Sequence, residues 1–91
     1  MTGNTVSGND FAGINVQTGP TGTLVADNVA ANNGSNGIDV RSASTTITRN
    51  TAYANGGRGI FAVAGVTDGG GNRAFSNAGP VQCSPTIVCS S

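Results

Sequence analysis

The chain has 91 residues, no formal net charge and only 9% charged residues, with no histidine. A length of this order fits a single domain. Four basic residues balance four acidic ones, so the sequence lacks the basic patch that nucleic acid or an acidic membrane surface requires, and we expect no nucleic-acid partner. No segment reaches about 18 consecutive apolar residues, which predicts no insertion into a membrane.

Asparagine recurs in two columns along the chain, and within each repeat the second Asn follows the first by five residues. The first column is Asn4, Asn28, Asn50 and Asn72, at spacings of 24, 22 and 22 residues. The second column is Asn9, Asn33, Asn55 and Asn77. We expect both columns at turns, because Asn tolerates left-handed backbone and its amide can bond to the backbone and to the next Asn.

Short alternating segments lie between the asparagines. They are Ile14-Asn15-Val16, Ile38-Asp39-Val40 and Thr46-Ile47-Thr48. Alternation with β-branched residues predicts strands of three to five residues with one buried face. Ile14, Ile38 and Ile60 follow the first Asn of their repeats by ten residues, so we expect one inward stack of isoleucines.

Other repeat positions support the same winding. Gly13, Gly37 and Gly59 precede the isoleucines and predict corners where a Cβ does not fit. A column three residues before the first Asn contains Val25, Ile47 and Gly69, and the position two after it contains Val6, Ala30, Ala52 and Ala74. Asp27 and Arg49 each precede an Asn of the first column, which predicts an ion pair between neighbouring coils.

A unit of 22–24 residues with two or three short strands fits one coil of a parallel β-helix. A left-handed β-helix uses hexapeptide units, and a leucine-rich repeat needs several leucines per unit, whereas this chain has only Leu24. We therefore predict an all-β, right-handed parallel β-helix of about four coils over residues 1–77, followed by a C-terminal cap over 78–91.

The pattern Asn-x-(Val/Ala)-x-x-Asn-x-x-x-Gly-Ile-x-Val resembles the right-handed parallel β-helix repeat family of the pectate-lyase-like superfamily, over roughly residues 3–77. The closing stretch, from Asp68 to Cys89, looks like the C-terminal end of secreted bacterial members. The resemblance implies a fold more than an activity, because the family includes lyases, hydrolases, epimerases and noncatalytic surface proteins. The sequence begins inside a repeat, without a signal peptide, so we expect a C-terminal piece of a longer chain whose signal lies upstream.

Two cysteines, Cys83 and Cys89, enclose five residues near the end of the chain. Two cysteines without histidine do not provide the four ligands of a structural metal site. A disulfide is the favoured interpretation, contributing about 2.4 kcal/mol for so small a loop and implying an oxidising compartment. Two reduced, partly buried thiols are the alternative. We expect no metal and no cofactor.

The outward positions of the Gly-Ile strands are the candidate binding surface. Eleven residues after the first Asn come Asn15, Asp39 and Phe61, and thirteen after it come Gln17 and Arg41, followed in the next repeat by Val63. Amide, carboxylate, guanidinium and aromatic groups suit sugar hydroxyls and ring faces, so polysaccharide is the candidate partner; a plain solvated sheet exterior is the alternative.

No catalytic set emerges from the sequence. Glycoside hydrolysis uses two carboxylates within about 5–10 Å, whereas Asp10, Asp27, Asp39 and Asp68 occupy different repeat positions. We predict a noncatalytic β-helix segment of a secreted or cell-surface protein, structural and carbohydrate-binding. The alternatives are the C-terminal part of a polysaccharide lyase or glycoside hydrolase with catalytic residues upstream, and a structural or adhesive stalk. An open N-terminal coil would also permit end-to-end stacking.

Overall fold

The computed structural model of the chain describes residues 2–18, 22–79, 81–84 and 86–90. Within these ranges every element is a short β-strand, all strand pairs are parallel, and no helix is long and apolar enough to span a membrane. The strands are β1 Thr5–Ser7, β2 Ile14–Val16, β3 Thr23–Ala26, β4 Val29–Ala31, β5 Ile38–Val40, β6 Thr45–Thr48, β7 Thr51–Tyr53, β8 Ile60–Ala62, β9 Thr67–Gly70, β10 Asn72–Phe75 and β11 Cys89–Ser90.

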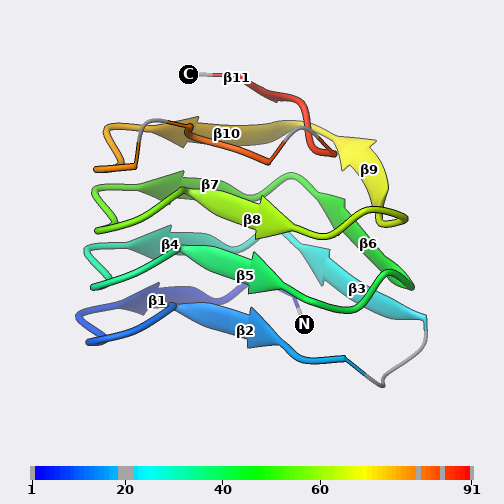
Figure 1. Cartoon of the computed structure of the whole chain (residues 1–91), viewed down its shortest axis with the longest axis horizontal. Coiled ribbons are helices and arrows are strands. Elements are labelled where there is room, and N and C mark those ends of the chain that lie inside the picture. The colour runs from blue at the N-terminus through cyan, green and yellow to red at the C-terminus, as the bar shows by residue number, and fades with distance from the viewer. Residues whose placement is uncertain (1, 19–21, 80, 85, 91) are drawn as a thin grey trace.

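The strands form three sheets that run along a solenoid (Figure 1). The first sheet has the order β1-β4-β7-β10-β11, the second β2-β5-β8 and the third β3-β6-β9. Each full turn contributes one strand to each sheet, so the described residues make about three full turns rather than the predicted four. The fourth repeat is a shortened coil because its Gly-Ile strand is replaced by a single bridge between Ile60 and Cys83.

The core consists of columns in which like residues lie over like residues. Ile14 pairs with Ile38 and Ile38 with Ile60, and all three are at most 2% exposed, which confirms the predicted isoleucine stack. A second column, of Val6, Ala30, Ala52 and Ala74, follows the strands of the first sheet. Stacking the coils is what buries these side chains, because one coil alone would leave its apolar face in water.

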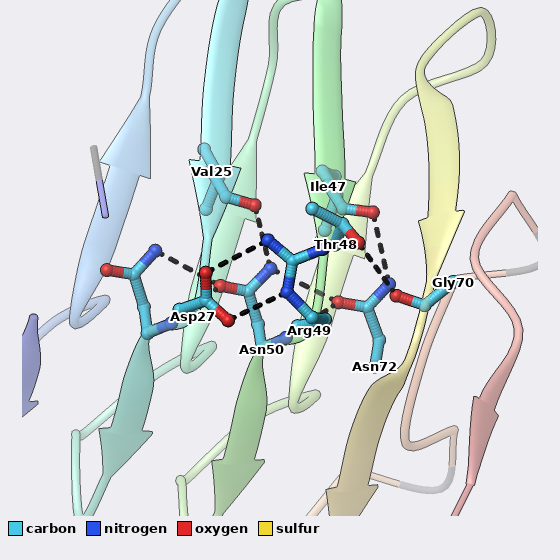
Figure 2. Close-up of polar contacts among 9 residues, drawn as sticks. Val25, Asp27, Ile47, Thr48, Arg49, Asn50, Gly70 and Asn72 are labelled. Atoms are coloured by element: carbon cyan, nitrogen blue, oxygen red, sulfur yellow. Dashed lines mark hydrogen bonds and ion pairs between the residues drawn. The ribbon is translucent and has the colours of Figure 1, made fainter. Parts of the chain in front are cut away.

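The two asparagine columns are hydrogen-bonded ladders with a direction. The Asn28 backbone N–H and Nδ2 both donate to Asn50 Oδ1, at 3.0 and 3.1 Å, and Asn50 donates in the same way to Asn72. Asn50 Nδ2 also donates to the Val25 carbonyl, as Figure 2 shows. In these pairs each ladder Oδ1 thus accepts from the preceding coil, while the backbone N–H and Nδ2 donate to the Asn of the following coil, and the second ladder repeats this pattern.

The prediction that the ladder asparagines themselves adopt left-handed backbone is wrong. The residue before each ladder Asn has a positive φ instead: Asp27 at 56° and Arg49 at 52° in the first ladder, Asn32 at 57° and Ala54 at 56° in the second. This bend at the preceding residue turns the corner, so the Asn side chain is directed into the coil, where its amide reaches both neighbouring coils.

The column of Val25, Ile47 and Gly69 is also corrected. A register shift places Asp68 opposite Ile47 and Gly70 opposite Thr48, so Gly69 is the extra residue of the irregularity. Asp68 Oδ1 accepts from the Gly70 N–H at 2.9 Å and from Asn72 Nδ2 at 3.2 Å. The bulge thereby brings a carboxylate oxygen to the last Asn of the first ladder.

The glycine corners behave as predicted. A Cβ on Gly37 would lie 2.5 Å from Asn55 Nδ2 and 2.8 Å from the Gly59 carbonyl oxygen. The corner glycines therefore allow successive coils to approach each other closely beside the second ladder.

The C-terminal segment closes over the last coil, and Cys83 and Cys89 form the predicted disulfide. Ile87 is 3% exposed and joins the core cluster, while β11 pairs with β10 at the end of the first sheet. Residues 81–84 and 86–90 are called the cap below.

Candidate functional site

The outer face of the second sheet gathers the residues that the sequence singled out. Asn15 pairs with Asp39 and Asp39 with Phe61, so these three form one column across β2, β5 and β8. Asn15 is exposed, Phe61 is half-buried, and Asp39 is only 8% exposed. The column is therefore not a uniform row of exposed groups.

The second column begins directly after these strands. The Arg41 N–H donates to the Val16 carbonyl at 2.7 Å and the Val63 N–H donates to the Val40 carbonyl at 3.2 Å, so successive coils remain in register there. Gln17 and Arg41 are both exposed. The two predicted columns thus lie side by side on one face.

Asp39 is engaged within the protein. Arg41 Nε donates to Asp39 Oδ1 at 2.7 Å and Arg41 Nη2 donates to Asp39 Oδ2 at 3.2 Å, which makes a bidentate pair between Asp39 in β5 and Arg41 just after this strand. Asn36 Nδ2 also donates to Asp39 Oδ2 at 3.2 Å. The carboxylate therefore orients Arg41 rather than offering its oxygens to a ligand or to a reaction.

Arg41 keeps its charge in this arrangement. The side-chain hydrogen bond with Asp39 and the attraction of its negative charge raise the pKa of Arg41 above its usual range. Its side chain is 49% exposed, so guanidinium N–H groups remain accessible from solvent.

Two guanidinium groups lie close to the Phe61 ring. The Arg41 Cζ is 4.3 Å from the centroid of the Phe61 ring and the Arg58 Cζ is 5.5 Å from it, both within the range of cation–π attraction. Arg58 Nη1 donates to Ser84 Oγ at 3.4 Å, which links this surface to the cap. Among the described residues, no carboxylate lies within ion-pair distance of Arg58.

Arg58 and Asn36 are the members of this cluster that the sequence prediction missed. Both follow the first Asn of their repeat by eight residues, and the Arg58 N–H donates to Asn36 Oδ1 at 2.8 Å. Extending the alignment by one more outward column would have found them. We call Asn15, Gln17, Arg41, Arg58 and Phe61, with Asp39 behind them, the Phe61 face.

Two other surface features have different chemistry. Tyr53 and Phe75 stack on the first sheet with ring centroids 5.2 Å apart and an interplanar angle of 3°, so each ring covers a face of the other. A shallow groove of about 680 Å³ follows the second Asn ladder, lined by residues such as Gly8, Asn32 and Ala54. This groove contains neither a cation nor an aromatic ring, so the Phe61 face remains the better candidate site.

The remaining predicted contact is structural. Arg49 Nε and Nη2 donate to the two carboxylate oxygens of Asp27 at 2.8 and 3.0 Å, as Figure 2 shows beside the Asn ladder. This confirms the predicted ion pair between neighbouring coils. Within the described ranges, no group of three potential metal-ligating side chains comes together.

Comparisons with known proteins agree with this architecture. No curated protein and no solved structure matched the chain. A family model described as right handed beta helix region matches residues 1–83, which include all three full turns and the start of the cap. The chain therefore belongs to the right-handed β-helix family.

Proposed function

We propose that this chain is a noncatalytic β-helix segment of a secreted or cell-surface protein that binds carbohydrate on its Phe61 face. The β-helix supplies a rigid support, and the Phe61 face supplies the chemistry. The protein's partner is an extended polysaccharide lying across β2, β5 and β8.

One observation carries the proposal: an aromatic ring on a regular sheet has two guanidinium groups close to it, with Cζ atoms 4.3 and 5.5 Å from the ring centroid. The edge of such a ring offers apolar contact to a sugar, and guanidinium N–H groups donate to hydroxyl or carboxylate oxygens. Asn15 and Gln17 add exposed amides, which both donate and accept, on the neighbouring coil.

A separate observation supports an extracellular location. The Cys83–Cys89 disulfide joins the cap across a short loop. Disulfides persist mainly in oxidising compartments such as the cell exterior, and this supports a secreted or surface-exposed protein.

A glycan array that includes neutral and acidic polysaccharides, followed by titration calorimetry, tests the proposal. Phe61→Ala is expected to lower affinity by at least about tenfold, because loss of the ring also removes the support beneath both guanidinium groups. Phe75→Ala is the matched control, since Phe75 also contacts an arginine, with the Arg73 Cζ 5.0 Å from its ring centroid, but lies on the first sheet.

Two results would contradict carbohydrate binding at this face. The first is a wild-type chain that binds no glycan on the array, which would favour a structural stalk. The second is equal loss of affinity in Phe61→Ala and Phe75→Ala, which would place the binding elsewhere or make it nonspecific. Circular dichroism of each variant checks that the strands are retained.

A further inference from the structure

The cap continues the second sheet beside the Phe61 face. Cys83 pairs with Ile60 in a parallel bridge, and the Ser84 N–H donates to the Ile60 carbonyl at 2.9 Å. The next residue of the cap is Ser84, and the next residue of β8 is Phe61. In this register Ser84 lies next to Phe61 on one side, and Asp39 pairs with Phe61 on the other. The cap is therefore a direct neighbour of the candidate binding surface.

The Ser84 hydroxyl is buried and accepts two hydrogen bonds. Ser84 is 2% exposed, and its Oγ accepts from the Ala62 N–H at 3.0 Å and from Arg58 Nη1 at 3.4 Å. The Ser84 carbonyl also accepts from the Ile87 N–H at 2.9 Å. Because its backbone and its side chain are both bonded, the hydroxyl has a fixed position beside β8.

Arg58 is held at two points. Its backbone N–H donates to Asn36 Oδ1 at 2.8 Å, and its carbonyl accepts from the Gly37 N–H at 3.0 Å. These bonds fix the start of the side chain on the neighbouring coil. At the other end, the bond to Ser84 Oγ is the one hydrogen bond that the guanidinium makes within the described ranges. The direction of the guanidinium beside the Phe61 ring thus depends on Ser84.

The two arginines near the Phe61 ring are oriented in different ways. Arg41 is held by the Asp39 carboxylate through bonds of 2.7 and 3.2 Å, so a negative charge already compensates its positive charge. Arg58 is held by a neutral hydroxyl, and no carboxylate of the described residues lies within ion-pair distance of it. A hydroxyl orients the guanidinium without compensating its charge, which leaves that charge available to a bound molecule.

We propose that Ser84 is a positioning residue of the Phe61 face, which holds the Arg58 guanidinium beside the Phe61 ring before a glycan binds. The inference rests on the carbohydrate binding proposed above. An arginine side chain loses much rotamer freedom when it is ordered, and a group that is ordered beforehand avoids this cost on binding. The Cys83–Cys89 disulfide closes the loop that contains Ser84, so it keeps the hydroxyl in place.

The cap provides a matched control for the substitution Ser84→Ala. Thr86 Oγ1 donates to the Ala62 carbonyl at 2.9 Å, while Ser84 Oγ accepts from the N–H of the same residue. Thr86→Val and Ser84→Ala therefore each remove one side-chain bond between the cap and Ala62. Of the two, Ser84→Ala alone also removes the bond to Arg58, so a difference between the variants reports on the guanidinium.

Titration calorimetry measures the effect on binding, with those neutral and acidic polysaccharides of the glycan array that the wild type binds. Ser84→Ala is expected to lower affinity about three- to tenfold, in the range of one hydrogen bond, and Thr86→Val less than about twofold. In an Arg58→Ala background, Ser84→Ala is expected to cause no further loss, because its effect passes through Arg58. Equal losses in Ser84→Ala and Thr86→Val, or a full further loss in the Arg58→Ala background, overturn the proposal.

Nuclear magnetic resonance of the free protein gives a readout that needs no glycan. The ring current of Phe61 shifts the Arg58 Nε–H resonance, so Ser84→Ala is expected to move this resonance toward its position in Phe61→Ala, and Thr86→Val to leave it in place. A folded Ser84→Ala variant with an unmoved resonance overturns the positioning role. If the wild type binds no glycan but the resonance moves as expected, carbohydrate binding fails and the positioning of Arg58 stands.

Circular dichroism shows whether Ser84→Ala keeps its strands. If it does not, Cys83→Ser/Cys89→Ser takes its place, because this double variant opens the loop and leaves the Ser84 hydroxyl present. It is expected to move the Arg58 Nε–H resonance in the same direction. A folded double variant in which this resonance stays at its wild-type position refutes the proposal.

Discussion

Replacing Asn50 by alanine tests whether the asparagine ladder stabilises the fold. Asn50 is fully buried, and its side chain takes part in four hydrogen bonds. Its Oδ1 accepts two bonds from Asn28, and its Nδ2 donates to the Val25 carbonyl and to Asn72 Oδ1. Asn50→Ala removes all four bonds at once.

The expected cost follows from the backbone groups that lose these bonds. The buried Asn28 N–H and the Val25 carbonyl each lose this partner, and a buried polar group left unsatisfied costs about 1–3 kcal/mol. We therefore expect Asn50→Ala to lower the free energy of unfolding by about 2–6 kcal/mol, since two such groups are affected. Native domains have only about 5–15 kcal/mol in total, so this is a large fraction.

Asn4→Ala is the matched control at the exposed end of the same ladder. Asn4 Nδ2 donates to Asn28 Oδ1 and to the Thr2 carbonyl, but Asn4 Oδ1 accepts no bond from a described residue. Loss of these exposed bonds should cost only about 0.5–1.5 kcal/mol. Urea denaturation followed by circular dichroism measures both values, and an equal cost at Asn50 and Asn4 would refute the argument from buried ladder bonds.

Four further substitutions have predicted effects on stability that chemical denaturation can check. Thr45→Val should stabilise the protein by about 1 kcal/mol, because the buried Thr45 hydroxyl has no hydrogen-bond partner among the described residues. Thr48→Val should destabilise it, because the Thr48 hydroxyl loses its bond to the Gly70 carbonyl. If both substitutions changed the free energy of unfolding in the same direction, this reasoning would be wrong. Ala54→Gly should stabilise slightly, because Ala54 has a φ of 56°, which costs an L-residue about 1–2 kcal/mol. The hydrogen bond from Arg49 lowers the pKa of Asp27 below its ordinary value of 3.8. The ion pair therefore stabilises the folded state above pH 3.8, and this stabilisation is lost as the pH falls through the lower pKa of the folded state. Asp27→Asn should therefore be less stable than wild type at neutral pH, and a difference that persists at low pH would argue against the pair.

The repeated part of the fold could be predicted from the sequence, because every coil must bury apolar side chains and bond its asparagines to the next coil. Ile14, Ile38 and Ile60 face one interior, and the ladder asparagines of the inner coils bond to an Asn in each neighbouring coil, so the spacing of these residues reveals the winding. The Asp27–Arg49 pair follows for the same reason, since residues in one repeat position become neighbours when coils stack.

The left-handed corners could not be read in this way. The residue directly before each Asn of the first ladder has a positive φ, but the residue type at this position varies. These residues are Gly3, Asp27, Arg49 and Gly71. The contacts with neighbouring coils impose the left-handed backbone at this position, so the residue type there does not reveal it. The Asp39–Arg41 pair was missed because it forms within one coil, where comparison between repeats gives no signal.

The ends of the solenoid are where repetition fails and where sequence reasoning was least accurate. Each ladder needs an acceptor at its C-terminal end, and Asp68 and Gln82 provide it from different repeat positions. Asp68 reaches its position through the bulge in β9, and Gln82 stands one residue later than the repeat spacing predicts. Neither residue could therefore be aligned with an asparagine of the repeat. These substitutes have the acceptor oxygen of Asn but end the stack, because β11 and the disulfide then cover the strand that a further coil would use. The polarity of the ladder thus explains why a side chain with an acceptor oxygen must close this end.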